Sequence, residues 1–358
     1  MARGSLYHPA IRNAGHNSAT LRGSANTRTR HAMKLAILDD YSKAALAAAD
    51  WEGIRRRGVE ITVFDTAFAS TDDAAAKLAP FEIVNLLRER THFTRALIEK
   101  LPNLRFIAMT GRRAPSLDIA AATEKGIPVS NTHGGEGGAS TAEMAWTLLL
   151  AAARDLTHAE RGMRAGRWHE GLRVGTVLEG RRLGVIGLGR LGSKIAGYGK
   201  AFGMDVVAWS QNLTPERAAE CGARLVGKDE LFSTSDFISI HVVLSDRTRG
   251  LIGAADFARM KPSAILVNTS RGPILDEAAL IAAIEQRRFA HAALDVYSRE
   301  PLPLDHPLRR MENVTLSPHL GYLNTDVFQH FYGESVKNIE AWLDGKPINV
   351  VNPDALKK

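Results

Sequence analysis

Residues 182–192 read Arg-Leu-Gly-Val-Ile-Gly-Leu-Gly-Arg-Leu-Gly. The stretch contains Gly187-x-Gly189-x-x-Gly192 between an apolar run that predicts a strand and a segment, 193–202, that predicts a helix. In that setting Gly187 permits a tight turn, Gly189 lets the backbone approach a pyrophosphate, and Gly192 allows close packing of helix on strand. The first N–H groups of the helix favour phosphate. The stretch predicts a dinucleotide-binding domain; a purely structural glycine-rich turn is the alternative.

Short apolar runs alternate with helical patterns on both sides of this stretch. The runs predict strands at 34–38, 60–64, 83–87, 106–109 and 128–130, and then at 183–187, 205–209, 237–241, 264–268, 291–296 and 314–316. Helices are predicted at 44–57, 95–100 and 118–125, and a long apolar one at 140–154. Strands that alternate with helices are typical of a parallel sheet covered on both faces. The predicted fold class is α/β, with two parallel-sheet domains that are Rossmann-like or flavodoxin-like.

Composition excludes several classes of protein. The chain has 358 residues and a net charge of +7, and residues 1–32 supply +5 of that charge through five arginines with no acidic residue. The nearly neutral remainder argues against a nucleic-acid partner. The one cysteine, Cys221, excludes an intrachain disulfide and a cysteine-rich metal site, and no metal is expected. The longest apolar run, 144–153, is too short to cross a membrane, so we expect a cytoplasmic protein.

The first 32 residues are expected to form a disordered basic leader. They lack the apolar core of a secretory signal, and Met33 opens the first predicted strand. A start codon placed too far upstream would produce such a tail. An organelle transit peptide, which is rich in arginine and poor in acid, is the alternative.

The residues after the second predicted strand of the dinucleotide domain bear on the choice of cofactor. Ser210 stands where an acid would bind the ribose 2′-hydroxyl of NAD, and Asp205 is at the wrong end of the strand. An acid at 210 would repel a 2′-phosphate, and a serine does not. Arg217 can face that phosphate or be a solvated helix charge. The cofactor is therefore NAD or NADP, with a slight preference for NADP.

Three downstream segments place polar residues at predicted strand ends, where ligands bind in open α/β sheets. They contain Arg271, Glu300 and His319. An arginine offers a bidentate partner for a carboxylate, a histidine shuttles protons near neutral pH, and a glutamate orients that histidine and favours its protonated form. Each residue alone has a structural alternative: a surface arginine, a loop carboxylate, and a capping or core histidine. Their occurrence together, behind the glycine fingerprint, favours a catalytic set.

With these motifs the chain resembles the D-isomer-specific 2-hydroxyacid dehydrogenases over nearly all of residues 33–352. The resemblance implies hydride transfer between NAD(P)H and a small 2-keto acid, with Arg271 on the carboxylate and His319 with Glu300 as proton shuttle. It implies cofactor contacts from Gly187, Gly189, Arg190, Leu191, Gly192, Ser210, His241, Val242, Thr269, Ser270, Asp295, Thr141 and Gly321. It implies substrate contacts from Arg88, Gly111 and Arg271.

The same resemblance implies a discontinuous architecture. Residues 33–132 and 323–352 form the substrate domain, residues 133–322 form the inserted NAD(P)-binding domain, and a helix at 328–344 returns to the first part. The family implies a homodimer with the 140–154 helix at the interface. The chain ends at 358, so we expect the short form without a regulatory domain.

Two departures from the family pattern put the substrate in doubt. Arg112 and Arg113 stand in a loop that is usually glycine-rich, where they either favour an acidic or phosphorylated substrate or only face solvent. Tyr322 replaces a small residue after Gly321, and its ring can narrow the substrate pocket.

Three rival functions stay open. A formate-dehydrogenase-like member pairs its histidine with glutamine, so Glu300 argues against it. A non-catalytic NAD(H)-sensing interaction protein of the same fold can keep all three polar residues. A nucleic-acid binder rests only on the charge of the leader.

Overall fold

The computed structural model describes residues 32–112, 115–133 and 138–357. The prediction of a disordered leader falls on residues outside these ranges, and so does Arg113 of the predicted substrate loop. Within the described ranges, no helix is both long enough and apolar enough to cross a membrane.

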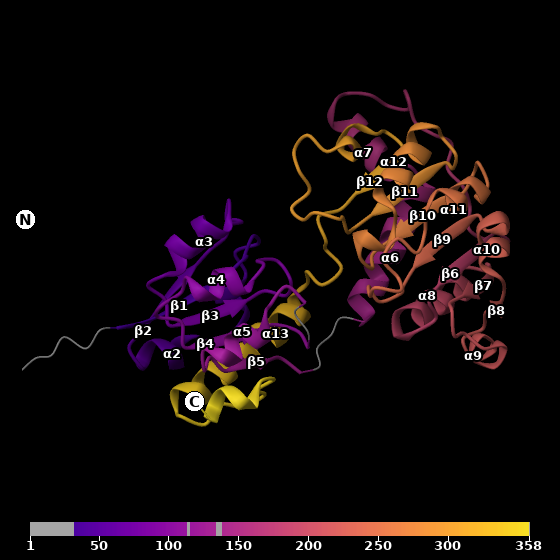
Figure 1. Ribbon diagram of the computed structural model, residues 1–358. Helices are drawn as coiled ribbons and strands as arrows, with labels where there is room; N and C mark the ends of the chain where they lie inside the picture. The colour runs from indigo at the N-terminus through magenta and orange to yellow at the C-terminus, as the bar shows by residue number, and fades with distance from the viewer. Residues whose placement is uncertain (1–31, 113–114, 134–137, 358) are drawn as a thin grey trace, which may run out of the picture. The chain divides into compact units, whose positions relative to one another are not determined.

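The first sheet has five parallel strands in the order β2-β1-β3-β4-β5 (Figure 1). The strands are β1 (Met33–Ile37), β2 (Val59–Val63), β3 (Ile83–Leu86), β4 (Phe106–Met109) and β5 (Val129–Asn131). This is the flavodoxin-like order. Strands β3 and β4 are buried at every position, as expected for parallel strands covered on both faces.

Helices cover both faces of this sheet. One apolar core joins it to α3 (Thr71–Leu78), α4 (Arg95–Glu99) and α5 (Ile119–Glu124), and a second joins it to α1 (Ala45–Ala48), α2 (Glu52–Arg56) and α13 (Thr325–Leu343). Helix α13 comes from the far end of the chain and contacts β4, β5, α1 and α2. The helix predicted at 328–344 therefore packs on the first sheet, and the division into domains at 132 and 322 stays a prediction.

The second sheet has seven parallel strands in the order β12-β11-β10-β9-β6-β7-β8. They are β6 (Arg182–Ile186), β7 (Asp205–Trp209), β8 (Arg224–Leu225), β9 (Phe237–Ile240), β10 (Ile265–Asn268), β11 (His291–Leu294) and β12 (Val314–Leu316). The chain reverses its direction of travel across the sheet between β6 and β9, which is the switch point at which ligands bind in such folds.

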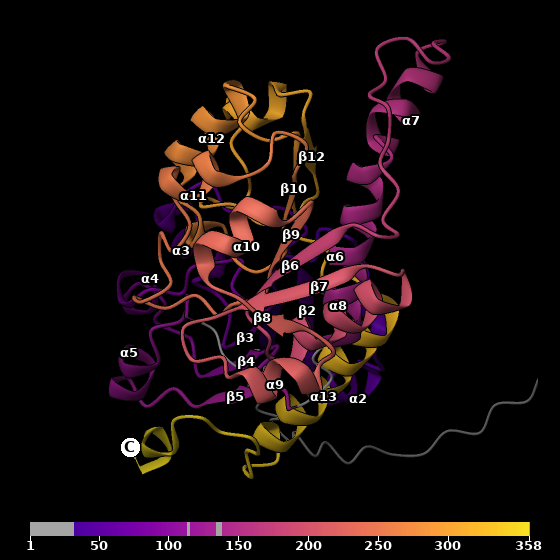
Figure 2. The ribbon, with the colours of Figure 1, turned by 90° about the vertical axis from the view of Figure 1, so that its right-hand side faces the viewer.

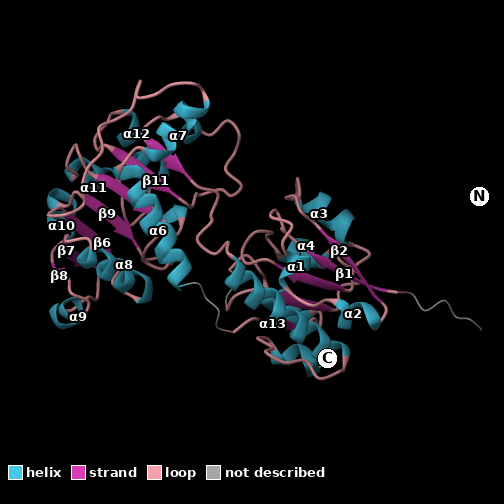
Figure 3. Ribbon diagram, turned by 180° about the vertical axis from the view of Figure 1, so that it is seen from behind, coloured by secondary structure: helices cyan, strands magenta, loops and turns pink. Residues whose placement is uncertain are grey.

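The helices of the second sheet also lie on both faces (Figure 3). One core contains α6 (Gly138–Ala153) and α8 (Arg190–Ala201), and the other contains α10 (Lys228–Thr234), α11 (Ala254–Arg259) and α12 (Glu277–Glu285). The remaining helices are α7 (Leu156–Arg164) and α9 (Pro215–Glu220), with single 3-10 turns η1 (Gly272–Ile274), η2 (Pro307–Arg310) and η3 (Pro353–Lys357).

Three local predictions need correction. The segment 44–57 is not one helix: Ala49 is extended, and the Asp50 carboxylate accepts the N–H of Glu52, which starts a second helix. Helix α8 begins at Arg190, three residues earlier than predicted, because Gly189 is its extended N-cap. The two-residue strand β8 was not predicted, because a pairing that short carries no periodicity.

The apolar character of the 140–154 segment has an explanation within the chain. Helix α6 packs on α8, β10 and β11, and its leucines and alanines belong to the core of the second sheet. The apolar character of this helix is therefore explained without a subunit interface, and the interface that the family implies stays a prediction.

Candidate active site

The glycine loop joins β6 to α8, and its three glycines have different surroundings. Gly187 has φ +90°, and a Cβ there would lie 2.8 Å from the carbonyl oxygen of His241. A Cβ on Gly192 would lie 1.9 Å from the carbonyl oxygen of Gly187. Gly189 has no atom within 4 Å of the place that a Cβ would take, and it is the N-cap of α8. Two glycines therefore serve packing, and the third leaves open space at a helix N-terminus.

The other predicted cofactor residues of the second sheet gather around this loop. The carboxyl ends of β6, β7, β9 and β10 carry Gly187, Gly189, Arg190, Leu191, Gly192, Ser210, His241, Val242, Thr269 and Ser270. Ser210 directly follows β7 and is half-buried, whereas Asp205 opens the strand and pairs with Arg182 at the opposite end. Ser210 therefore stands at the carboxyl end of β7, where an acid would bind the ribose 2′-hydroxyl of NAD.

Arg217 lies beside the N-terminal part of α8. Its guanidinium donates to the Oγ of Ser193 at 3.2 Å and to Glu220 at 2.9 Å, and its side chain is half exposed. The arginine is therefore a surface cation at the edge of the glycine loop. It can turn toward an anion there at the cost of a weak exposed ion pair.

Two buried polar atoms at the ends of β9 and β10 have no hydrogen-bond partner among the described residues: Nδ1 of His241 and Oγ1 of Thr269. The Nε2 of His241 is bonded to Ser239 at 2.7 Å, and burial lowers the pKa of His241 to about 3, so the ring is neutral. The hydroxyl of Ser270 donates to a carbonyl of β9 at 2.7 Å. Unpaired polar atoms at a switch point are what a bound ligand satisfies. They fit a nicotinamide dinucleotide, as does the open space at Gly189.

His319 and Glu300 form a direct pair. The Nδ1 of His319 and the Oε2 of Glu300 are 2.6 Å apart, and the second oxygen of Glu300 accepts the backbone N–H of Tyr297 at 3.0 Å. His319 has φ +56°, a left-handed conformation that a non-glycine residue seldom adopts. The loop therefore holds His319 in a backbone conformation that costs free energy, as expected at a functional site.

Asp295 holds this loop in place. One of its oxygens accepts the hydroxyl of Ser317 at 2.5 Å and the N–H of Leu320 at 2.7 Å, and the other accepts the N–H of Gly321 at 2.9 Å. The hydroxyl of Thr141 donates to the carbonyl of Gly321 at 2.9 Å. Asp295, Thr141 and Gly321, all predicted to contact the cofactor, are thus brought together, and Asp295 anchors both residues that follow His319.

Arg271 lies three residues after the end of β10 and directly before η1. Its Nη1 donates to the carbonyl of Ser270 at 2.7 Å, and its Nη2 lies 3.1 Å from a carboxylate oxygen of Glu89. A Cβ on the next residue, Gly272, would lie 2.1 Å from the carbonyl carbon of Tyr297, so the two loops that carry Arg271 and Glu300 touch through their backbones.

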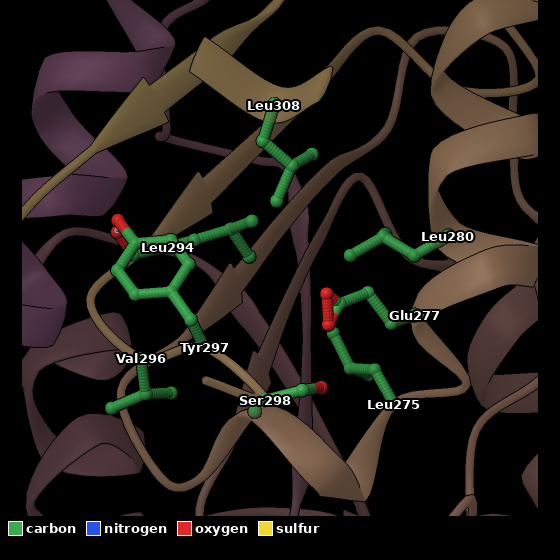
Figure 4. Close-up of a pocket in the computed structure, with 9 residues that line it drawn as sticks. Leu275, Glu277, Leu280, Leu294, Val296, Tyr297, Ser298 and Leu308 are labelled. Atoms are coloured by element: carbon green, nitrogen blue, oxygen red, sulfur yellow. Dashed lines mark hydrogen bonds between the residues drawn. The ribbon is translucent and has the colours of Figure 1, made fainter. Parts of the chain in front are cut away.

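A small cavity beside η1 is not part of the site. Its volume is about 10 Å³, which is room for one water molecule, and its walls are mainly apolar. Figure 4 shows Leu280, Leu294 and Leu308 among the side chains around it. None of the predicted site residues lines it, so it is a packing gap of the core.

The loop after β3 carries alternating charges and contacts Arg271 and Glu300. Its sequence is Arg88-Glu89-Arg90-Thr91. Glu89 pairs with Arg271, and Arg90 forms a salt bridge to Glu300. Arg88 takes another direction: its guanidinium lies 5.9 Å from the ring centroid of Phe331 and next to Gly111. The predicted substrate residues Arg88 and Gly111 therefore lie together, and it is Glu89 that meets Arg271.

Tyr322 completes the surroundings of the histidine. Its ring meets that of His319 edge-on, with centroids 5.7 Å apart, and the guanidinium of Arg90 lies 5.2 Å from its centroid. A cavity of about 720 Å³ is lined by Tyr322, His319, Glu300, Arg90 and other residues. That volume is within the range of small-molecule sites, and the ring of Tyr322 forms part of the cavity wall.

The surroundings of the pair lower the pKa of both His319 and Glu300. For Glu300, burial would raise the pKa, but the contact with His319, the N–H of Tyr297 and the charge of Arg90 outweigh it and lower the pKa to about 2. For His319, burial lowers the pKa, the Glu300 carboxylate opposes this, and Arg90 and Arg271 add to the lowering. Glu300 thus stays ionised beside an imidazole whose pKa lies below its usual value.

Sequence reasoning missed Glu89, Arg90 and Asp39. Asp39 has φ +62°, accepts the N–H and hydroxyl of Thr91 at 3.0 Å each, and lines the same cavity. Alternating charges at the end of a buried strand were the available signal, but a charge in a loop gives no clue to its partner in another part of the chain. Among the described residues, no group of three histidine, cysteine or acidic side chains could hold a metal ion.

Comparisons with known proteins agree with this geometry. The family model described as D-isomer specific 2-hydroxyacid dehydrogenase, NAD binding domain, matches residues 146–321. A D-3-phosphoglycerate dehydrogenase of Archaeoglobus fulgidus is 38% identical over 80% of this chain and 53% of its own. A glyoxylate reductase of Aeropyrum pernix is 39% identical over 73% of this chain and 80% of its own. A phosphoglycerate oxidoreductase structure from Vibrio cholerae has a TM-score of 0.83 at 34% identity, and the match covers 87% of this chain and 99% of that one. The chain spans about half the length of the Archaeoglobus fulgidus relative.

Proposed function

Because the chain belongs to the D-isomer-specific 2-hydroxyacid dehydrogenase family, we propose that it reduces a small 2-keto acid to the D-2-hydroxy acid with NAD(P)H. The observation that carries the proposal is the His319–Glu300 pair, 2.6 Å apart, in a loop that Asp295 and Thr141 fix through Gly321. Histidine paired with a carboxylate, with an arginine nearby, is the set that protonation of an alkoxide and binding of a carboxylate require.

The roles of the residues follow from their contacts. Because Nδ1 of His319 is bonded to Glu300, Nε2 is the nitrogen that holds and releases the proton. Arg271 binds the substrate carboxylate with its guanidinium and polarises the carbonyl. The bound cofactor supplies the hydride. Burial of the pair lowers the local dielectric constant and strengthens each of these interactions.

Within this proposal NADP is slightly favoured over NAD. The absence of an acid at Ser210 removes the repulsion that a 2′-phosphate would meet, and Arg217 at the edge of the glycine loop supplies a cation. The test is the dissociation constant of NADPH and of NADH for the wild type and for Arg217→Ala. We expect the variant to lose affinity for NADPH and to keep its affinity for NADH.

We propose a homodimer, in which the segment after α6 extends the interface predicted for the 140–154 region. Helix α7 and the residues that follow it extend away from the second sheet (Figure 2). Five large apolar residues are exposed there: Leu156, Met163, Trp168, Val174 and Val177. Exposed apolar clusters mark interaction surfaces. Sedimentation of the wild type and of Trp168→Ser tests this, and a monomeric wild type would contradict it.

The proposed partners are small 2-keto and 2-hydroxy acids, with neither a nucleic acid nor a membrane as partner, and the proposed location is the cytoplasm. Without the five arginines of residues 1–32 the net charge of the chain falls from +7 to +2, which does not favour a nucleic-acid partner. The single cysteine cannot form an intrachain disulfide, so the chain does not need an oxidising compartment.

The experiment that tests the activity is a spectrophotometric screen. It pairs NADH and NADPH with glyoxylate, hydroxypyruvate, pyruvate, phenylpyruvate and 3-phosphohydroxypyruvate. We expect oxidation of the cofactor with at least one acid, and loss of that activity in His319→Ala and Arg271→Ala with cofactor binding largely kept. Tight cofactor binding without turnover of any acid would refute the dehydrogenase and favour an NAD(H)-sensing protein.

A further inference from the structure

The residue that receives the substrate carboxylate already has a carboxylate bound. Glu89 reaches Arg271 across from the loop after β3, with 3.1 Å between Oε1 and Nη2. Both side chains are largely buried, with 26% of Glu89 and 31% of Arg271 exposed. The pair is therefore more than a loose surface contact, in which screening by water would leave little interaction.

We propose that Glu89 is a specificity-determining residue that restricts the site to monoanionic 2-keto acids and rejects substrates with a second anionic group. The inference rests on the proposed function, because it takes Arg271 as the carboxylate-binding residue. A monoanionic acid shares the Arg271 guanidinium with Glu89. A phosphorylated or dicarboxylic acid brings further negative charge close to the Glu89 carboxylate and is repelled.

The charges around the site support this assignment. Arg271 is matched by Glu89, and Arg90 is matched by Glu300, so each of these arginines already has an acidic partner. The cavity beside His319 is also lined by Asp39, whose pKa burial raises, and by Asp65, which pairs with Lys43 at 3.3 Å. Next to Arg271 a second anionic group on the substrate would therefore meet the Glu89 carboxylate, while the neighbouring Arg90 is already paired with Glu300.

Two other cations need to be considered. Arg309 lines the same cavity, but its guanidinium is engaged by the carbonyls of Pro303 and Leu302 at 2.7 and 2.6 Å. Arg88 lies on the ring of Phe331 and beside Gly111. Either arginine would bind a phosphate group only if the substrate reached it. The wild type would then prefer the phosphorylated acid, and the experiment below detects that preference.

The experiment compares kcat/KM for two classes of acid in the wild type, Glu89→Gln and Glu89→Asp. The monoanions are glyoxylate and hydroxypyruvate, and the multiply charged acids are oxaloacetate and 3-phosphohydroxypyruvate. We expect the wild type to prefer the monoanions. In Glu89→Gln, kcat/KM for the multiply charged acids should rise relative to the monoanions by about tenfold, equivalent to about 1.4 kcal/mol. Glu89→Asp keeps the charge and should keep the preference.

Glu99→Gln is the matched control, because it removes the same charge from an exposed position on α4. A purely structural role of Glu89 would lower kcat/KM for both classes together and leave their ratio unchanged. An unchanged ratio in Glu89→Gln, or a wild type that prefers the phosphorylated acid, would overturn the assignment. Failure of the proposed function looks different, since the wild type would then turn over no acid of either class.

Discussion

The three glycines of the cofactor loop make separable predictions, and Gly192→Ala is the sharpest. The new Cβ would lie 1.9 Å from the carbonyl oxygen of Gly187 and 3.0 Å from its carbonyl carbon. Both are backbone atoms of the turn that ends β6, so no side-chain rotation relieves the contact. Helix α8 must move away from the turn, and overpacking of this kind costs about 1–3 kcal/mol.

The movement affects both stability and cofactor binding. We expect Gly192→Ala to lower the melting temperature by several degrees, at about 2–4 °C per kcal/mol for domains of this size. The N–H groups at the start of α8 shift with the helix, so the dissociation constant of the cofactor should rise at least about tenfold, or about 1.4 kcal/mol.

Two variants of neighbouring glycines serve as controls. Gly197→Ala lies within α8 with no atom within 4 Å of the new Cβ, and it should be neutral or stabilising by up to about 1 kcal/mol. Gly189→Ala also meets no atom, and it loses at most about 1 kcal/mol because alanine is a poor N-cap. Yet its Cβ occupies the space in which a pyrophosphate would lie, so cofactor binding should weaken strongly.

Differential scanning calorimetry and titration of cofactor fluorescence measure the two effects separately. The reasoning fails if Gly192→Ala melts at the wild-type temperature. It fails equally if Gly189→Ala binds the cofactor as tightly as Gly197→Ala does.

Three further predictions concern the polar residues. Glu300→Gln removes the carboxylate that raises the pKa of His319. It should slow reduction about 100-fold at pH 7. It should also move the acid limb of the pH–rate profile of the oxidation reaction to lower pH, which stopped-flow measurements over a range of pH will show. Arg271→Lys should lower kcat/KM about 100-fold by loss of the bidentate fork, with an unchanged cofactor dissociation constant in equilibrium titration. Burial, with Arg173, lowers the pKa of His291 to about 4, so the folded state keeps the ring neutral. The free energy of unfolding should therefore fall by about 2 kcal/mol between pH 6.5 and 5, because only the unfolded state takes up a proton at His291 over this interval. His291→Gln should make the free energy of unfolding, measured by urea denaturation, less dependent on pH over the same interval. An unchanged pH dependence in the variant would contradict the argument.

The elements of the fold were largely predictable from local patterns. Strands β4, β7 and β12 have the predicted bounds, because short apolar runs between turn residues carry a clear signal. The long helix was less predictable in its first turn, and the 44–57 segment was misread as one helix. In that segment the helix propensity of alanine is continuous, but the helix breaks at Ala49, and the backbone N–H of Glu52 donates to the Asp50 carboxylate at the start of the second helix.

The order of residues was enough to predict the glycine spacing, the parallel α/β class and the presence of Arg271, Glu300 and His319 at strand ends. These features depend on neighbours a few positions away, and backbone geometry relates them directly to the sequence. Partners could not be read in this way. The bond of Glu89 to Arg271 joins residues 182 positions apart, and that of Arg90 to Glu300 joins residues 210 apart. Such pairs form only when two sheets bring distant loops together, and burial then makes the interactions of these charges stronger than those of exposed arginines and glutamates.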